Sequence, residues 1–170
     1  MLEVLQMLYR YNSAMTARLL DALEKLSPEE YNAPGCSGHG SVRDTLAHLL
    51  AAQWSWFSWF DRSMEPAQAD ALDIRGEEVE SLTEARRRWA EIDRQTNRCV
   101  AALTEETIRE EWTETMPNRT SWSLPLWQIL LHVANHGTHT RAQIVAAIRR
   151  AGHKPGGYEL VRFALSEKSR

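Results

Sequence analysis

Three histidines and an arginine lie within the ten residues HVANHGTHTR, residues 132–141. Half of the six histidines of the chain are in this stretch: His132, His136 and His139. A neutral imidazole donates a lone pair to zinc, nickel or iron, and its pKa near 6.5 leaves it mostly neutral at pH 7. The stretch therefore has the chemistry of a metal site or a catalytic base. The competing interpretation is a helix whose histidines make ordinary hydrogen bonds.

The helix that carries these side chains is expected to present them beside its buried face. A helical wheel places four polar residues at about 220–280° from the first core residue, Leu126: His132, His136, His139 and Gln143. The same wheel, started at Val42, places His48 at about 240° on an earlier helix. Two helices thus each offer histidine from the edge of the core. Facing helices of a bundle are a common place for a first-row divalent metal, and an open ligand position there would hold an activated water.

Helical periodicity recurs along the chain, and no segment alternates with the period of two that is typical of strands. Four long helices and a short closing helix are predicted, at about 2–25, 41–62, 81–103, 123–150 and 158–165. SPEE (27–30) and SVRD (41–44) read as helix starts with Ser as N-cap. The segment 63–78 is a polar, irregular connection, and 104–123 is expected to hold a helical turn or an extended piece. The sequence predicts an all-α four-helix bundle with long connections, in one domain over residues 1–170.

Composition excludes several classes of protein. The 170 residues are 43% hydrophobic and 25% charged, as in an ordinary soluble domain. A net charge of −3 argues against a nucleic-acid-binding surface. The N-terminus lacks the pattern of a signal peptide, and no apolar run is long enough to span a membrane. A cytoplasmic protein is expected, with Cys36 and Cys99 as reduced thiols.

Other side chains allow two interpretations each. The chain has seven tryptophans, among them Trp54, Trp56 and Trp59, which either fill the core or form the wall of a ligand site. Cys36, in a Gly-rich loop, could be reactive, whereas Cys99, within a helix, is expected to be a buried, inert thiol. His153 belongs to a turn and is expected to be structural or exposed.

Four stretches together resemble a known group of proteins: YRYNSAMTARLLDALEKLSPEEYN, GSVRDTLAHLLAAQWSWFSWF, LLHVANHGTHTRAQI and GHKPGGYELVRFAL. Over nearly the whole chain the sequence is similar to the DinB/YfiT-like superfamily of bacterial four-helix bundles. The resemblance implies a divalent metal, zinc or nickel, held by one histidine of the second helix and an HxxxH pair of a later helix. His48 and His136 match the first two ligands. The third falls on Thr140, because Arg141 and Gln143 align with the family's following HR.Q.

Neutral threonine is a poor metal ligand, so this departure leaves three alternatives. His139 is the first substitute, since it lies within the i,i+3 reach of His136 on a helix. His132, four residues before His136, is the second. The third alternative is that metal binding has been lost. The expected metal site is therefore His48, His136 and His139.

Two functions follow from the resemblance and from the threonine at the family's third ligand position. The first is a metal-dependent hydrolase or thiol-S-transferase that acts on a small molecule or thiol, in which the ion generates the nucleophile. In this function Arg141 either orients an anionic substrate group or pairs with a carboxylate, and Gln143 makes supporting hydrogen bonds. The second is a non-catalytic bundle that binds a small molecule or a protein partner. The resemblance also implies a homodimer formed through helix faces.

Overall fold

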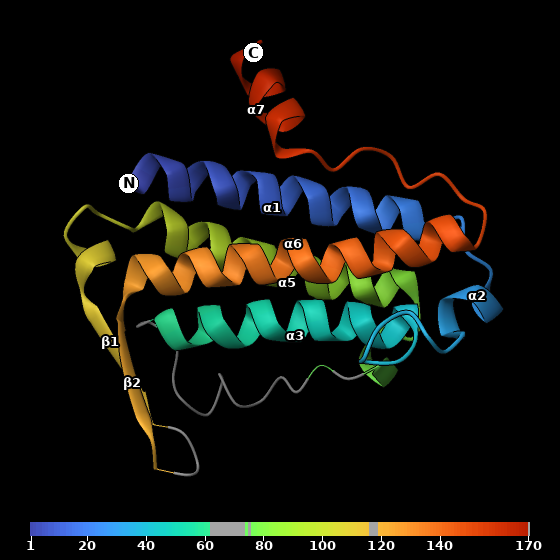
Figure 1. Cartoon of the computed structure of the whole chain (residues 1–170), viewed down its shortest axis with the longest axis horizontal. Coiled ribbons are helices and arrows are strands. Elements are labelled where there is room, and N and C mark those ends of the chain that lie inside the picture. The colour runs from blue at the N-terminus through green and yellow to red at the C-terminus, as the bar shows by residue number, and fades with distance from the viewer. Residues whose placement is uncertain (62–73, 75, 116–118, 170) are drawn as a thin grey trace.

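Four long helices lie side by side in the computed structural model, which describes residues 1–61, 74, 76–115 and 119–169 (Figure 1). They are α1 (Leu2–Leu23), α3 (Val42–Phe60), α5 (Leu82–Ala101) and α6 (Leu126–Arg150). α1 packs against α5 and α6, and α3 packs against the same two helices. The prediction of a helical bundle is thus confirmed in its broad form. Most of the predicted connection 63–78 lies outside the described residues, apart from Ile74 and the 3₁₀ turn Gly76–Val79.

Serine side chains fix the starts of three helices. Ser27 caps the short helix α2 (Pro28–Asn32), and Glu30 completes a reciprocal capping box. Ser41 and Asp44 form the same arrangement at the start of α3, and Ser81 caps α5. The helix starts predicted at 27–30 and 41–44 are therefore confirmed. α1 and α3 each end two residues earlier than predicted.

A β-hairpin occupies the connection between α5 and α6. A 3₁₀ turn (Thr107–Arg109) leads into β1 (Glu111–Thr115), which pairs with β2 (Ser121–Pro125) as antiparallel strands. The extended alternative for 104–123 was therefore right. Ser123 does not start the last long helix: it lies in β2, where its hydroxyl donates to Glu111 Oε2 at 2.9 Å. α6 begins at Leu126 without a side-chain cap, and the Leu126 N–H donates instead to the Glu110 carbonyl oxygen.

The core continues to the end of the bundle that the hairpin covers. On α3, Val42, Leu46 and Leu49 are buried, whereas Trp56 and Phe60 are only half-buried. Phe57 is buried instead, and its ring packs edge-on against Tyr9 of α1. The half-buried aromatic side chains of α3 therefore face the hairpin rather than the centre of the bundle.

A chain of buried polar side chains crosses the interior. Arg141 of α6 donates to the side-chain oxygen of Asn12 on α1. The Asn12 amide donates to Gln53 Oε1 on α3 at 2.8 Å, and Gln53 Nε2 donates to Thr96 Oγ1 on α5 at 2.9 Å. Each of the four long helices contributes one member, and all four are buried. Because an unpaired polar group is costly in a core, these bonds favour one alignment of the helices.

The last helix, α7 (Leu160–Lys168), lies outside the bundle next to α1 (Figure 1). It begins two residues later than predicted. Arg10 of α1 donates to Glu167 at 2.8 Å, and the Tyr11 ring packs against Phe163. In the described parts of the chain, no helix has the length and apolar character needed to cross a membrane.

Candidate functional site: a histidine pair between α3 and α6

His48 of α3 and His136 of α6 meet across the groove between their helices. Their Nε2 atoms are 3.0 Å apart, and the ring planes are inclined at 67°. Both side chains are half-buried, as expected for residues on the shoulder of a core face. At this distance one ring donates its Nε2–H to the lone pair of the other. The two histidines singled out by the sequence therefore converge on one point.

A third imidazole, that of His39 in the loop before α3, joins this pair. The His39 ring stacks on the His48 ring with centroids 3.7 Å apart and planes within 18°. The loop is closed by a bond from the Cys36 N–H to the Gly40 carbonyl oxygen, and Gly40 has a φ of +114°. That backbone conformation suits glycine and turns the chain back over the first turns of α3. The signal in the sequence was weak: a glycine-flanked histidine just before a helix cap.

Burial keeps the pair uncharged at neutral pH. The pKa of His136 is lowered to about 4, first by burial and then by the nearby imidazoles of His48, His132, His139 and His39. Burial, and then His39, also lower the pKa of His48. Neutral imidazoles keep the lone pairs that a metal ion needs.

An aromatic cavity of about 370 Å³ lies next to the pair. Its walls come from α3, α6 and the hairpin: Trp56, Glu114, Trp122, Leu124, Ile129 and His132. The ring centroids of His132 and Trp56 are 5.7 Å apart, and those of His132 and His136 are 6.4 Å apart. Trp54 is buried in the core, whereas Trp56 helps to form this wall. Both interpretations of the tryptophans thus apply, to different residues.

A family model and one relative match most of this chain. A model of the DinB family matches residues 1–170. The chain belongs to the DinB family. It is 27% identical to Protein DinB of Bacillus subtilis (strain 168) over 162 residues, which cover 92% of each protein.

The DinB resemblance implies a metal site with three protein ligands. Among the described residues, two of the candidate ligands, His48 and His136, meet. Two nitrogens bound to one tetrahedral zinc lie roughly 3.3 Å apart, so the 3.0 Å between the His48 and His136 Nε2 atoms needs only a small shift. No group of three His, Cys, Asp or Glu side chains arranged to hold a metal occurs in the described parts of the chain. The pair therefore fits two positions of a metal site. Among the described residues, no third side chain completes the site.

His139 and Thr140 lie apart from the pair in this DinB-family chain. The exposed His139 ring is 3.1 Å, Nε2 to Nε2, from the side-chain amide of Gln143. Gln143 thus supports His139 rather than the pair. Thr140, at the family's third position, is 2% exposed. On a helix, residues one apart point about 100° from each other, so His139 and Thr140 face different surroundings.

The other candidates lie elsewhere. Arg141 faces α1 rather than the pair, and it donates hydrogen bonds to the uncharged side chains of Asn12, Thr16 and Thr138. His153 lies beside the Glu30 carboxylate at 3.1 Å, which agrees with the structural role expected of it. Burial raises the pKa of Cys36, and raises that of Cys99 to about 11. Both thiols are therefore protonated at neutral pH and poor nucleophiles.

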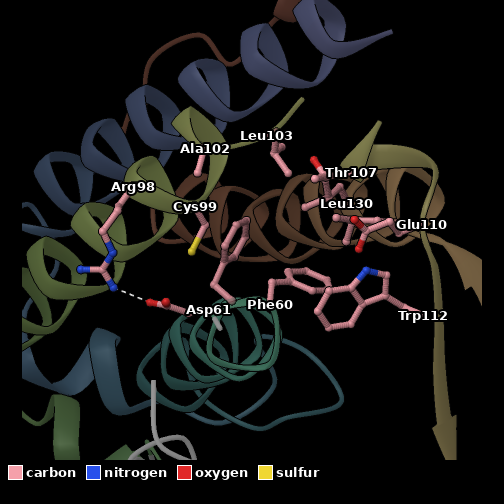
Figure 2. A pocket seen from close by; sticks show the side chains of 12 residues that line it. Phe60, Asp61, Arg98, Cys99, Ala102, Leu103, Thr107, Glu110, Trp112 and Leu130 are labelled. Carbon is pink, nitrogen blue, oxygen red and sulfur yellow. Dashed lines mark hydrogen bonds and ion pairs between the residues drawn. The ribbon is translucent and has the colours of Figure 1, made fainter. Parts of the chain in front are cut away.

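A second apolar cavity, of about 330 Å³, lies between the ends of α3 and α5 and the hairpin (Figure 2). Figure 2 shows Cys99 and the Phe60 and Trp112 rings around it, with the Asp61–Arg98 ion pair at one side. Its lining has no histidine, and its cysteine is the poorly nucleophilic Cys99. The histidine pair is therefore the better candidate for a functional site.

Proposed function

We propose that this chain is a divalent-metal-binding DinB-family protein, built as a four-helix bundle, in which His48 and His136 bind zinc or nickel. The convergence of two neutral imidazoles from separate helices carries the proposal. His139 is the proposed third ligand; its ring would have to turn away from Gln143. His132 and His39, on either side of the pair, are the alternatives.

The reaction proposed for this site is metal-dependent hydrolysis or thiol transfer. A bound zinc or nickel ion lowers the pKa of a coordinated water or thiol and so supplies a nucleophile at neutral pH. The chain's own residues provide the rest of the site. His48 and His136 remain neutral, and Trp56 and Trp122 offer an aromatic wall for the apolar part of a substrate. Since both described cysteines are protonated, the nucleophile is expected to come from outside the chain.

A non-catalytic bundle that binds a small molecule or a protein is the second candidate function. The burial of Thr140 favours it, and so does the lack, among the described residues, of a third side chain placed with the pair to hold a metal. In that case the hydrogen bond between His48 and His136 would join α3 to α6, and the aromatic cavity would still hold a ligand.

Metal analysis of protein without a histidine tag separates the two. We expect about one zinc or nickel per chain, and less than about a tenth of that after His48→Ala or His136→Ala. His153→Ala removes a histidine paired with Glu30, away from the site, and should leave the metal content unchanged. Comparing His139→Ala, His132→Ala and His39→Ala then identifies the third ligand. Substoichiometric metal that none of these changes affects would reject the metal site.

A further inference from the structure

Arg141 carries a positive charge that is buried among neutral partners. Its side chain is 2% exposed. Nη1 donates to Asn12 Oδ1 and to Thr16 Oγ1, and Nη2 donates to Thr138 Oγ1 at 3.3 Å. The guanidinium carbon is 5.8 Å from the centre of the Tyr11 ring. Among the residues that the structure describes, no carboxylate forms an ion pair with it.

A buried charge without a counter-ion is costly, even when its hydrogen bonds are made. Burial lowers the pKa of Arg141 to about 10, so the side chain is still cationic at neutral pH. The hydrogen bonds to the asparagine and the two threonines satisfy N–H groups but bring no negative charge. An anion that reached the guanidinium would supply it through charge-assisted bonds.

Arg141 is also one of the residues that line a cavity of about 280 Å³. It lies between α1, the second half of α6 and the segment that leads into α7, and Ala142 and Val145 form its apolar floor. Arg149, exposed in the last turn of α6, lines it as a second cation. Glu159 also lines it, and its carboxylate is 3.7 Å from Arg162 Nε. The two arginines thus outnumber the one acidic side chain of this lining.

Tyrosine rings complete the cavity. The Tyr11 hydroxyl donates to the Tyr158 carbonyl oxygen at 2.5 Å, which fixes the C-terminal segment over α1. Burial raises the pKa of Tyr158 to about 12, and the Asp21 carboxylate acts in the same direction. Three positive charges oppose that shift: Arg18, Arg141 and Arg149. Positive groups therefore outnumber the one negative group that acts on this phenol.

We propose that this cavity binds a small aromatic oxyanion, an aryl phosphate or aryl carboxylate, through Arg141 and Arg149. The oxyanion accepts bonds from the two guanidinium groups, and the ring lies against Tyr11 and Tyr158. Ligand sites commonly combine an apolar lining with a few convergent polar groups, and a volume near 300 Å³ suits a molecule of this size.

This site does not depend on the histidine pair. His136 faces α3, whereas Arg141, five residues later, faces α1. The proposal therefore holds for a protein whose metal site is absent or removed. Binding should persist in the His48→Ala/His136→Ala double variant.

Isothermal titration calorimetry of the full chain with phenyl phosphate tests the proposal. We expect saturable binding of one equivalent, and no saturable binding of neutral phenol. Arg149→Gln should weaken the affinity by about tenfold or more, since it removes one of the two cations. Arg150→Gln is the matched control: it makes the same charge change one residue away, and Arg150 donates to the Gly35 carbonyl oxygen outside the cavity. Its affinity should equal that of the unchanged protein.

Arg141→Gln should abolish binding in protein that retains its helical circular dichroism. Should this variant fail to fold, the comparison of Arg149→Gln with Arg150→Gln decides on its own. The absence of saturable binding at millimolar phenyl phosphate would overturn the proposal. Equal weakening by the two surface variants would do the same, because it would indicate a general charge effect. Comparing phenyl phosphate with benzoate at the same ionic strength shows which of the two oxyanions the site prefers.

Discussion

At the scale of single residues, the histidine pair is defined by where its protons lie. The 3.0 Å contact between the His48 and His136 Nε2 atoms requires a proton on Nε2 of one ring and a lone pair on Nε2 of the other. A proton on the second Nε2 would point two N–H donors at each other with no acceptor between them, and would break the contact. The site is therefore built for neutral imidazole, which is the state that both hydrogen bonding and metal binding need.

Acid should destabilise the metal-free protein through this pair. The pKa of His136 is about 4 in the folded protein and near 6.5 in the unfolded chain, so between these values the unfolded state binds more protons. The free energy of unfolding contributed by His136 is complete above pH 6.5 and falls as the pH drops toward 4. Urea unfolding in EDTA at pH 7.5 and 5.0 measures this loss. His136→Gln should reduce it, and an imidazole of His136 that titrates near pH 6.5 by NMR would contradict the expectation.

At the scale of elements, the approach of α1 to α6 depends on one missing methyl group. A Cβ at Gly137 would lie 2.6 Å from Asn12 Oδ1 and 3.0 Å from Arg141 Nη1. Asn12 and Arg141 cannot move freely, because both side chains are buried and Asn12 is also hydrogen-bonded to Gln53. The glycine thus allows the polar chain through the core to form.

Gly137→Ala should therefore destabilise the protein by about 1–3 kcal/mol, as overpacking in a core does. The sign of the change in stability is informative, because alanine in a helix is favoured over glycine by roughly 0.5–1 kcal/mol when nothing obstructs it. Chemical denaturation compares it with Asn135→Ala, an exposed control in the same turn, which should change stability little. A Gly137→Ala protein as stable as the original would show that α1 and α6 can separate without cost.

The sequence predicted the elements whose signals are local and repeated. Apolar periodicity located the long helices, and the Ser27 and Ser41 capping patterns located the starts of α2 and α3. The hairpin was less predictable, because its strands are five residues each and largely exposed, so they lack a period-2 burial pattern. Helix bounds were misplaced by up to three residues, because the ends concerned carry no capping signal.

The candidate site was predictable to the extent that a helical wheel describes it. His48 and His136 share equivalent shoulders, and they meet. His39 was not predicted, because its position depends on the path of a loop rather than on a repeat. The wheel also grouped His139 with His136, but it could not show that the His139 ring lies beside Gln143. These are contacts set by side-chain rotamers and loop conformation.

At the scale of the whole molecule, α7 leaves apolar surface uncovered. None of its residues is buried, and Val161 and Leu165 are 64% and 60% exposed. Val4 of α1 and Leu131 of α6 are exposed as well. Exposed apolar side chains are typical of an interface, so we predict that a homodimer, if one forms, uses α7.

Sedimentation equilibrium at micromolar concentration should then give twice the 19.5 kDa of one chain. Val161→Asp with Leu165→Asp should shift the protein to the monomer, because both charges would be buried in the interface. Ser166→Asp, on the same exposed helix, adds one of the two charges without removing an apolar side chain and should leave the dimer intact. A single 19.5 kDa species for the unchanged protein would reject the dimer.

The line of hydrogen bonds from Arg141 to Thr96 also limits how this chain can change its length. Inserting one residue into a long helix on either side of its polar member would rotate everything beyond it by about 100°. The rotated segment could not keep both the polar bond and its apolar stripe in place. Insertions and deletions should thus be better tolerated between the long helices and at the chain ends, because those segments carry no member of this line of hydrogen bonds.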